Sequence, residues 1–322
     1  MLPAPKPPAC CGVALQNLVG AAGCNKAVPP EVTGYLQASL SDNSRRAYRG
    51  DLTHFLGWGG VVPATPELVA TYLAAHAGKS GVATLARRLV SVGKAHVTRG
   101  YPSPVESELV RATMRGIRNT HGSAQRQVAP ALKDDVLRMV SGLSGVKGIR
   151  DKALLLVGFA GAFRRSELVS LTMADVEQAQ QGLVFHLRFS KTDQEGQGRK
   201  VAIPFARGAV CPVLALQQWL DIAGITEGPI FRPVNRHGVV ADVSLSAQAV
   251  ALVVKERAKA VGLDPAKFAG HSLRSGLVTS AVQLGVPSWK IRQQTGHTSD
   301  AMLARYIRDA NLFVDNAAGA VL

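Results

Sequence analysis

Apolar and polar positions follow a helical period in the first part of the chain, over residues 31–121. Apolar side chains recur there three and four positions apart, as on one face of a helix. Ser44 is of the type that caps a helix, and Pro66 stands at a first helical position, where its missing N–H does no harm. The pattern predicts four helices: from Arg45 to the glycine-rich stretch at 57–60, from Pro66 onward, over residues 84–99 and over residues 103–118.

The period changes in the second part of the chain. Residues 132–143 and 148–171 still have a helical pattern. Four residues then alternate as the inward-facing residues of a half-buried strand do: Leu183, Phe185, Leu187 and Phe189. A glycine-punctuated turn and a second strand are expected next, and a further short strand later: residues 193–198, 200–204 and 229–232. The remainder is helical, so we expect a mainly α chain in which the second domain is α+β, with a small β-hairpin or sheet.

Composition indicates where the domains begin and end. Residues 1–29 are rich in Pro, Ala and Gly and predict a disordered leader. A helical bundle is expected over residues 30–121. The stretch from 122 to 130 is polar and predicts a linker, so the second domain is expected over residues 131–322.

Charge indicates the kind of partner. The net charge is +15 and the pI about 10.1, which favours a polyanion. Residues 1–130 hold 14 Lys/Arg and 6 Asp/Glu, and residues 131–322 hold 23 and 16. Because both halves are basic, the distribution fits a two-domain grip on double-stranded DNA better than a membrane-anchoring tract. Candidate DNA-contacting side chains of the helical domain are Arg45, Arg46, Arg87, Arg88, Arg115 and Arg118.

Other features bound the protein class. Four cysteines form neither a disulfide framework nor a zinc-binding spacing, which fits a reduced cytoplasm. No run reaches the roughly 18 apolar residues of a membrane span. We find no Walker loop and no clustered Asp/Glu metal site, and we expect neither a metal nor another cofactor.

Candidate chemistry gathers near the C-terminus. His271 and Arg274 stand three positions apart, so on a helix they share a face. His297 follows Gly296, 26 residues after His271, and Tyr306 comes nine residues later.

Two further candidates lie upstream. Arg164 stands in Ala-Phe-Arg-Arg-Ser-Glu-Leu, with Glu167 three residues after it. Lys191 stands where the first strand of the hairpin runs into its turn, with Arg199 and Lys200 across the same hairpin.

The order and spacing of these residues resemble the signature of the tyrosine recombinase (phage integrase) family. The matching positions are Arg164, Lys191 in a hairpin, His271-x-x-Arg274, Gly296-His297 and Tyr306. The resemblance covers residues 131–322, and the helical domain is similar to the family's core-binding domain. Five matched positions in order are a far stronger signal than any single short motif. The resemblance implies an integrase-like catalytic domain in a simple two-domain recombinase that cuts and rejoins DNA through a 3′-phosphotyrosine bond.

The chemistry explains why these residue types belong together. Arg164 and Arg274 would hold the non-bridging phosphate oxygens and stabilise the charge of the transition state, which a Lys, lacking the planar fork, does poorly. Tyr306 would attack the phosphorus, and since a free phenol has a pKa near 10, His271 would accept its proton.

The remaining members would assist the reaction. Lys191 would protonate the leaving 5′-oxygen, with Lys200 and Arg199 as alternatives for this role. His297 would donate a hydrogen bond to the phosphate, and Glu167 would orient the cluster.

Simpler interpretations stay open for single residues. Arg164 and Glu167 also fit a surface helix pair, and His271 a helix cap. His297 and Tyr306 also fit ordinary packing positions. Ser275 and Gly276 follow Arg274 where many relatives carry a His-Thr or His-Ser pair, a departure expected to affect packing.

Other functions stay open for the whole chain. They are a non-catalytic DNA-binding relative, a type IB topoisomerase that relaxes DNA without sequence preference, and a helical scaffold or membrane-surface protein. The resemblance also implies a dimer on one site and a tetramer in synapsis, in which residues 312–322 would dock on a neighbouring subunit or on their own domain. The target sequence and the biological role are not fixed by the sequence.

Overall fold

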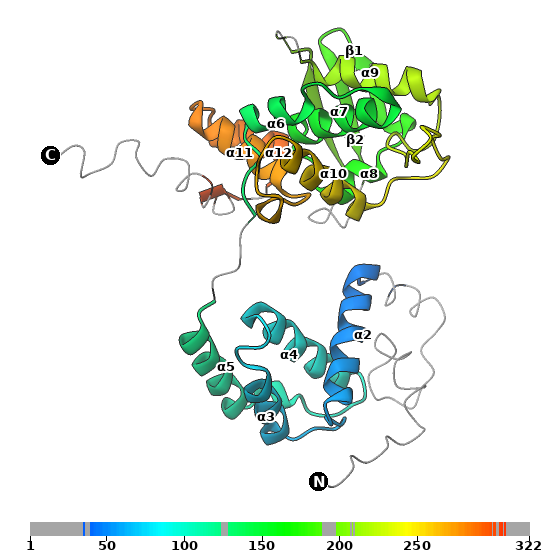
Figure 1. Cartoon of the computed structure of the whole chain (residues 1–322). Helices are drawn as coiled ribbons and strands as arrows, with labels where there is room; N and C mark the ends of the chain where they lie inside the picture. The colour runs from blue at the N-terminus through cyan, green and yellow to red at the C-terminus, as the bar shows by residue number, and fades with distance from the viewer. Residues whose placement is uncertain are drawn as a thin grey trace, which may run out of the picture. The chain divides into compact units, whose positions relative to one another are not determined.

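The computed structural model describes residues 35, 39–123, 128–188, 198–206, 208, 210–297, 299–300, 303–304 and 306. Several predicted features lie wholly or partly outside these residues: the leader at 1–29, part of the linker at 122–130, Phe189, Lys191, the turn at 193–198, and the tail at 312–322. The chain divides into two compact units, Met1–Arg126 and Gln127–Leu322. Figure 1 shows the described helices and strands of both units.

The first unit is helical, as the period of its sequence predicts. Its helices are α2 (Asp42–Gly57), α3 (Pro66–His76), α4 (Val82–Val97) and α5 (Glu108–His121), with a 3-10 turn at Pro104–Glu106. Helix α2 packs on α4, and α3 on α5, around a core that includes Leu52, Phe55 and Tyr72.

The first residues of α2 and α3 are set by the capping residues before them. Thr65 caps α3 by accepting a hydrogen bond from the backbone N–H of Leu68, so the helix begins at Pro66, as predicted. The expected cap at Ser44 is wrong: Ser41 caps α2 and accepts a hydrogen bond from Ser44 N–H, so the helix begins three residues earlier.

The second unit surrounds the buried helix α7 (Gly145–Ala160). The remaining helices are α6 (Lys133–Val140), α8 (Arg165–Ser170), α9 (Pro212–Ala223), α10 (Ala247–Ala260), α11 (Ser272–Gln283) and α12 (Ser288–Thr295). Helices α6, α9 and α11 contact α7, and α10 contacts α8. The core is apolar, with Leu154, Phe163, Phe185 and Trp219 fully buried.

A small antiparallel sheet completes this unit, in the order β1-β2-β3. The predicted hairpin is present as β2 (Gly182–Leu187) and β3 (Arg199–Pro204), with Leu187 opposite Arg199. Strand β1 (Val176–Ala179) was not predicted. The mainly α architecture with a small sheet agrees with the fold class expected from the sequence.

Two predicted elements are wrong. Residues 148–171 are not one helix, because the chain breaks between the end of α7 at Ala160 and the start of α8 at Arg165. Residues 229–232 form no strand among the described residues. Pro229 makes only an isolated bridge with Thr172, since a proline has no N–H to continue a ladder.

Candidate active site

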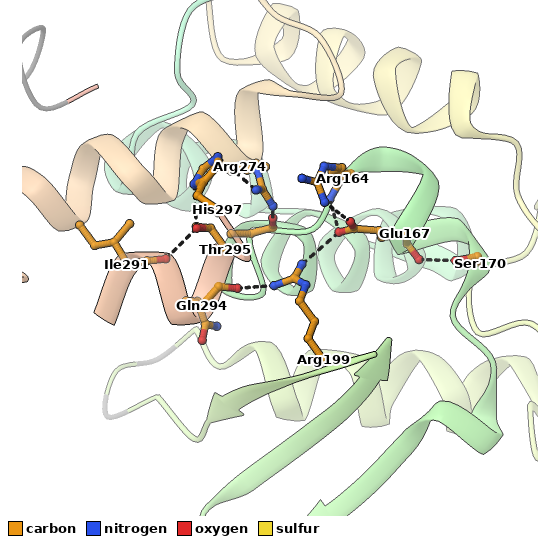
Figure 2. A network of polar contacts seen from close by, with 10 residues as sticks. Arg164, Glu167, Ser170, Arg199, Arg274, Ile291, Gln294, Thr295 and His297 are labelled. Atoms are coloured by element: carbon orange, nitrogen blue, oxygen red, sulfur yellow. Dashed lines mark hydrogen bonds and ion pairs between the residues drawn. The ribbon is translucent and has the colours of Figure 1, made fainter. Parts of the chain in front are cut away.

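The break between α7 and α8 positions Arg164. Ala162 has φ +49°, a left-handed conformation that residues with a Cβ rarely adopt, and it turns the chain sharply. Arg164 then stands at the N-cap of α8. The buried carboxylate of Glu167 accepts one hydrogen bond from the Arg164 backbone N–H, at 2.9 Å, and one from its guanidinium Nη1, at 2.5 Å. Figure 2 shows this pair facing Arg274. Glu167 therefore fixes both the backbone and the guanidinium of Arg164.

Arg274 lies in the first turn of α11, which packs on α7. Its side chain is only 1% exposed, and Nη1 donates to the carbonyl of Ala162 at 2.8 Å. Burial, together with the positive charge of Arg164, lowers the pKa of Arg274 to about 10. The guanidinium therefore keeps its charge at neutral pH and is held next to the break that carries Arg164.

His297 follows the C-cap of α12, where Gly296 takes the left-handed conformation that ends a helix (φ +69°). Arg274 Nη2 and His297 Nε2 are 3.2 Å apart, and since a guanidinium only donates, Nε2 accepts. The proton then resides on Nδ1, which donates to Thr295 Oγ1 at 2.8 Å, and that hydroxyl donates to the carbonyl of Ile291 at 2.7 Å.

These contacts require a neutral imidazole. Burial, with the positive charges of Arg274 and Arg164, lowers the pKa of His297 to about 4. The arrangement differs from the expected donation to a phosphate, which stays a prediction and requires the proton on Nε2.

His271 and Tyr306 form the second half of the cluster. The Nε2 atom of His271 lies 3.1 Å from the hydroxyl oxygen of Tyr306. His271 precedes α11 as its N-cap residue, so Arg274 follows it within one turn. Tyr306 packs against the small apolar cluster of Val278, Ile291 and Leu303, which aims its ring at the histidine.

The same surroundings affect the protonation of His271. Burial first, and then the positive charges of Arg274 and Arg164, lower the pKa of His271. A neutral imidazole beside a phenol is an acceptor for the phenolic proton.

The predicted residues therefore meet from four separate segments. The structure brings together Arg164, Glu167, His271, Arg274, His297 and Tyr306. One further residue joins them, Arg199 of β3, which donates to Glu167 at 3.2 Å. The sequence indicates Arg199 only as an alternative to Lys191 as the general acid. Its position at the start of a strand gives no signal of a contact with Glu167, 32 residues away.

The arginines predicted to contact DNA lie in α2, α4 and α5, and several have acidic partners within the unit. Arg87 donates from Nε and Nη2 to the two oxygens of Asp51, each at 2.8 Å, and Asp51 is only 4% exposed. Arg88 also faces Asp51, at 4.0 Å. These two side chains thus hold α4 against α2, which is a structural role the sequence did not indicate.

The other four belong to α2 and α5. Arg45 pairs with Asp42, Arg46 donates to Asn43 at 3.5 Å, and Arg115 pairs with Glu108. Arg118 is exposed on α5. In the part of the chain that the structure describes, no helix combines the length and the hydropathy needed to cross a bilayer.

Known proteins resemble the chain over most of its length. Residues 132–312 match the model of the phage integrase family. An integrase/recombinase xerD homolog of Selenomonas ruminantium is 41% identical over 293 residues, covering 88% of this chain and 86% of that protein. Tyrosine recombinase XerC of Herpetosiphon aurantiacus is 25% identical over 301 residues, covering 86% and 88%.

Solved structures share the fold. XerH site-specific recombinase bound to palindromic difH substrate, in a post-cleavage complex, superposes with a TM-score of 0.63 at 15% identity, covering 89% of this chain and 82% of that one. Lambda integrase (residues 75–356) bound to DNA superposes with a TM-score of 0.60 at 18% identity, covering 86% and 92%. The family match over more than half of the chain, together with the 41% identical relative, shows that this chain belongs to the phage integrase family of tyrosine recombinases.

Proposed function

We propose that this tyrosine-type site-specific recombinase cuts and rejoins double-stranded DNA with Tyr306 as its nucleophile. The observation that carries the proposal is the 3.1 Å contact between His271 Nε2 and the Tyr306 hydroxyl, beside the guanidiniums of Arg164 and Arg274. A proton acceptor on the phenol and two cations for the phosphate are what an in-line attack on a phosphodiester requires.

In the cleavage step, protein side chains and the DNA account for every bond and proton, without a cofactor. The phenolic oxygen of Tyr306 forms a bond to phosphorus, and its proton passes to His271 Nε2. The bond from phosphorus to the 5′-oxygen breaks, and that oxygen takes a proton from Lys191, which we retain as the general acid. The 3′-phosphotyrosine bond conserves the phosphodiester energy, so the 5′-hydroxyl of another strand reverses the step and rejoins the DNA.

Arg164 and Arg274 supply the electrostatic part. Each presents a planar fork of donors, which matches the non-bridging oxygens of a phosphate. Because the site is largely buried, the attraction is stronger than it would be in water. Their fixed positions, on Glu167 and on the Ala162 carbonyl, mean that little reorganisation is needed when the phosphate arrives.

His297 acts on the phosphate after a change of partner. In the DNA-free chain, Arg274 donates to its Nε2. When a phosphate oxygen accepts from Arg274 Nη2 in place of His297, Nε2 is released and, once it carries the proton, donates to the same phosphate. The low pKa of His297 favours the neutral ring, so the proton moves between the two ring nitrogens rather than being added.

Both units contribute to binding. The basic charge of each half and the exposed arginines of the helical unit support a grip on a duplex, in which residues 30–121 form the core-binding domain and residues 131–322 the catalytic domain. Among the structural neighbours, lambda integrase is recorded as a dimer bound to a core site and as a tetramer bound to a Holliday junction. We propose the same assemblies here, acting in the cytoplasm.

Covalent trapping tests the nucleophile. The native protein, Tyr306→Phe and a control, Tyr101→Phe, are incubated with labelled duplexes from the flanks of the chain's own gene and then denatured. Tyr101 is exposed in the other unit, so its loss leaves the site unchanged. Adducts with the native and Tyr101→Phe proteins, but none with Tyr306→Phe, are expected.

Two results would contradict the proposal. An adduct that persists in Tyr306→Phe would assign the nucleophile to another residue. DNA binding without any adduct in the native protein would favour the non-catalytic alternative, which no feature of the site supports.

A further inference from the structure

Arg199 lies where the β2–β3 hairpin, Glu167 of α8 and the end of α12 meet. It is the first residue of β3, at the base of the hairpin, and its side chain is 18% exposed. Its Nη2 donates to Glu167 Oε2 at 3.2 Å, and its Nη1 donates to the carbonyl of Gln294 at 2.8 Å. Figure 2 shows the side chain reaching from the strand to both partners.

The first contact divides the charge of one carboxylate between two arginines. Glu167 Oε1 accepts from Arg164 Nη1, while Oε2 accepts from the Arg164 backbone and from Arg199. Together, the three guanidiniums of Arg164, Arg199 and Arg274 and the one carboxylate leave the cluster with an excess of two positive charges. With Arg199 removed, Glu167 would neutralise Arg164 more completely and weaken its attraction for a phosphate.

The second contact holds the turn that carries His297. Gln294 belongs to the last turn of α12, whose carbonyls lack partners within the helix, and a cation there is favourable. A Cβ built on Gly296 would lie 2.9 Å from Arg199 Nε, so the guanidinium lies directly against this glycine. His297 is the next residue. Arg199 Nε itself is buried and makes no hydrogen bond among the described residues.

Gln294 reinforces the same junction. Its side-chain amide donates to the carbonyl of Ala160, at the end of α7, and to the carbonyl of Ala202 in β3. The end of α12 is thereby joined to the hairpin twice, once through the Gln294 side chain and once through Arg199.

We propose that Arg199 is a positioning residue for the recombination reaction, which fixes Arg164 through Glu167 and His297 through the Gly296 turn, and so couples the base of the β2–β3 hairpin to the phosphate-binding side chains. Both donors of its planar fork are used, toward acceptors that lie 32 and 95 residues away. A lysine retains the charge but not this fork, so it replaces Arg199 only in part.

The first test separates catalysis from binding. Arg199→Met removes the fork at similar side-chain length, Arg199→Lys keeps the charge, and Arg188→Met serves as the control. Arg188 lies just beyond β2 in the same hairpin region, 68% exposed and paired with Asp175. The rate of adduct formation at saturating DNA and the Kd for DNA are measured separately, with the duplexes that trap Tyr306.

We expect Arg199→Met to lower the rate by about tenfold to a hundredfold, as a small misplacement of catalytic groups does, with little change in Kd. Arg199→Lys should fall between Arg199→Met and the native protein, and Arg188→Met should match the native protein. A rate for Arg199→Met equal to that of the control would overturn the proposal.

The second test needs no reaction, since the catalytic inference rests on the proposed function. Hydrogen–deuterium exchange is followed in the DNA-free, full-length protein and Arg199→Met. Faster exchange confined to the amides at Gly296 and His297 is expected. Unchanged exchange there would refute the positioning role, because Arg199 would then have no effect on the turn. Faster exchange that extends into α7 would also refute it, because Arg199 would then stabilise the whole fold. If the native protein forms no adduct, the proposed function fails, while the exchange result still decides whether Arg199 fixes the turn.

Discussion

At the scale of single residues, the site is built from charged groups that are held in place before DNA arrives. Arg274 is bound to a backbone carbonyl, Arg164 to Glu167, and His297 to a chain of hydroxyl and carbonyl groups. Each contact orients a hydrogen-bond donor. It also reduces the conformational entropy that the side chain would otherwise lose when DNA binds. The neutral state of His297 is part of this arrangement, because a charged ring would face the guanidinium of Arg274.

This neutral state predicts a pH dependence of stability. The folded-state pKa of His297 is about 4, below its ordinary value of 6.5. As pH falls from 6.5 to 4, the unfolded chain gains a proton at this residue before the folded chain does, so stability is lost across that window. Each unit of lowered pKa corresponds to about 1.4 kcal/mol, so this residue accounts for a loss on the order of 2–3 kcal/mol.

Chemical denaturation at several pH values measures the effect. His297→Gln cannot take up this proton. Its free energy of unfolding should therefore fall less on acidification than that of the native protein, and the gap between the two proteins should narrow from pH 6.5 to 4. A gap that stays constant over this range would show that the pKa of His297 is not lowered in the folded chain.

At the scale of elements, helix α11, which carries Arg274, has another segment lying directly against its backbone. The N–H of Ala131 donates to the carbonyl of Ser272 at 2.9 Å, and the N–H of Lys133 donates to Ser280 Oγ at 3.2 Å. A Cβ on Gly276 would lie 1.7 Å from the Ala131 carbonyl oxygen. The sequence departure at Gly276 is thus a packing feature, as expected.

Gly276→Ala should therefore destabilise the second unit by about 3 kcal/mol, since no adjustment of a flexible side chain can relieve a clash with backbone. Gly116→Ala is the comparison, because Gly116 is exposed in α5 and a Cβ there meets nothing within 4 Å. That change should raise the stability of the first unit by about 0.5–1 kcal/mol through helix propensity. Thermal or urea unfolding of the two variants measures both. Equal effects would mean that the close approach at α11 has no energetic weight.

At the scale of the whole molecule, the charge is spread over both units, and the described contacts sort the arginines by role. Arg87 is half-exposed, but its guanidinium is bound by the buried carboxylate of Asp51, whereas Arg118 is exposed and forms no ion pair with a described residue. The same residue type therefore serves the fold at one position and is available to a polyanion at another.

DNA affinity should fall steeply with salt, by about a thousandfold between 50 and 200 mM if six or more phosphates are contacted. Arg118→Gln should weaken binding and reduce the slope of log K against log salt by about one, with no loss of stability. Arg87→Gln should instead lower the stability of the first unit, because it leaves Asp51 buried with fewer partners. Binding isotherms and unfolding curves distinguish the two. A flat salt response would contradict a grip based on phosphate contacts.

Local sequence patterns determined much of this protein. Alternation at residues 183–187 was enough to predict the hairpin, because one face of the strand is buried. Strand β1 carried no such signal: Val-Glu-Gln-Ala has no alternating apolar run, and it pairs only because β2 lies beside it. The identity and order of the polar residues were sufficient to indicate the family and its phosphoryl-transfer chemistry.

Tertiary structure decided which residues from distant segments are in contact. The apolar period runs through Ala162 without interruption, yet the helix breaks there, where the Arg274 guanidinium, 112 residues away, binds the buried Ala162 carbonyl. Arg199 joins the site, and Arg87 is bound by Asp51, for the same reason. Periodicity and caps act over a few residues, so the sequence itself determined the elements and the reactive groups. Contacts between distant segments form only when the core packs, so only the folded chain decided which charges share a partner.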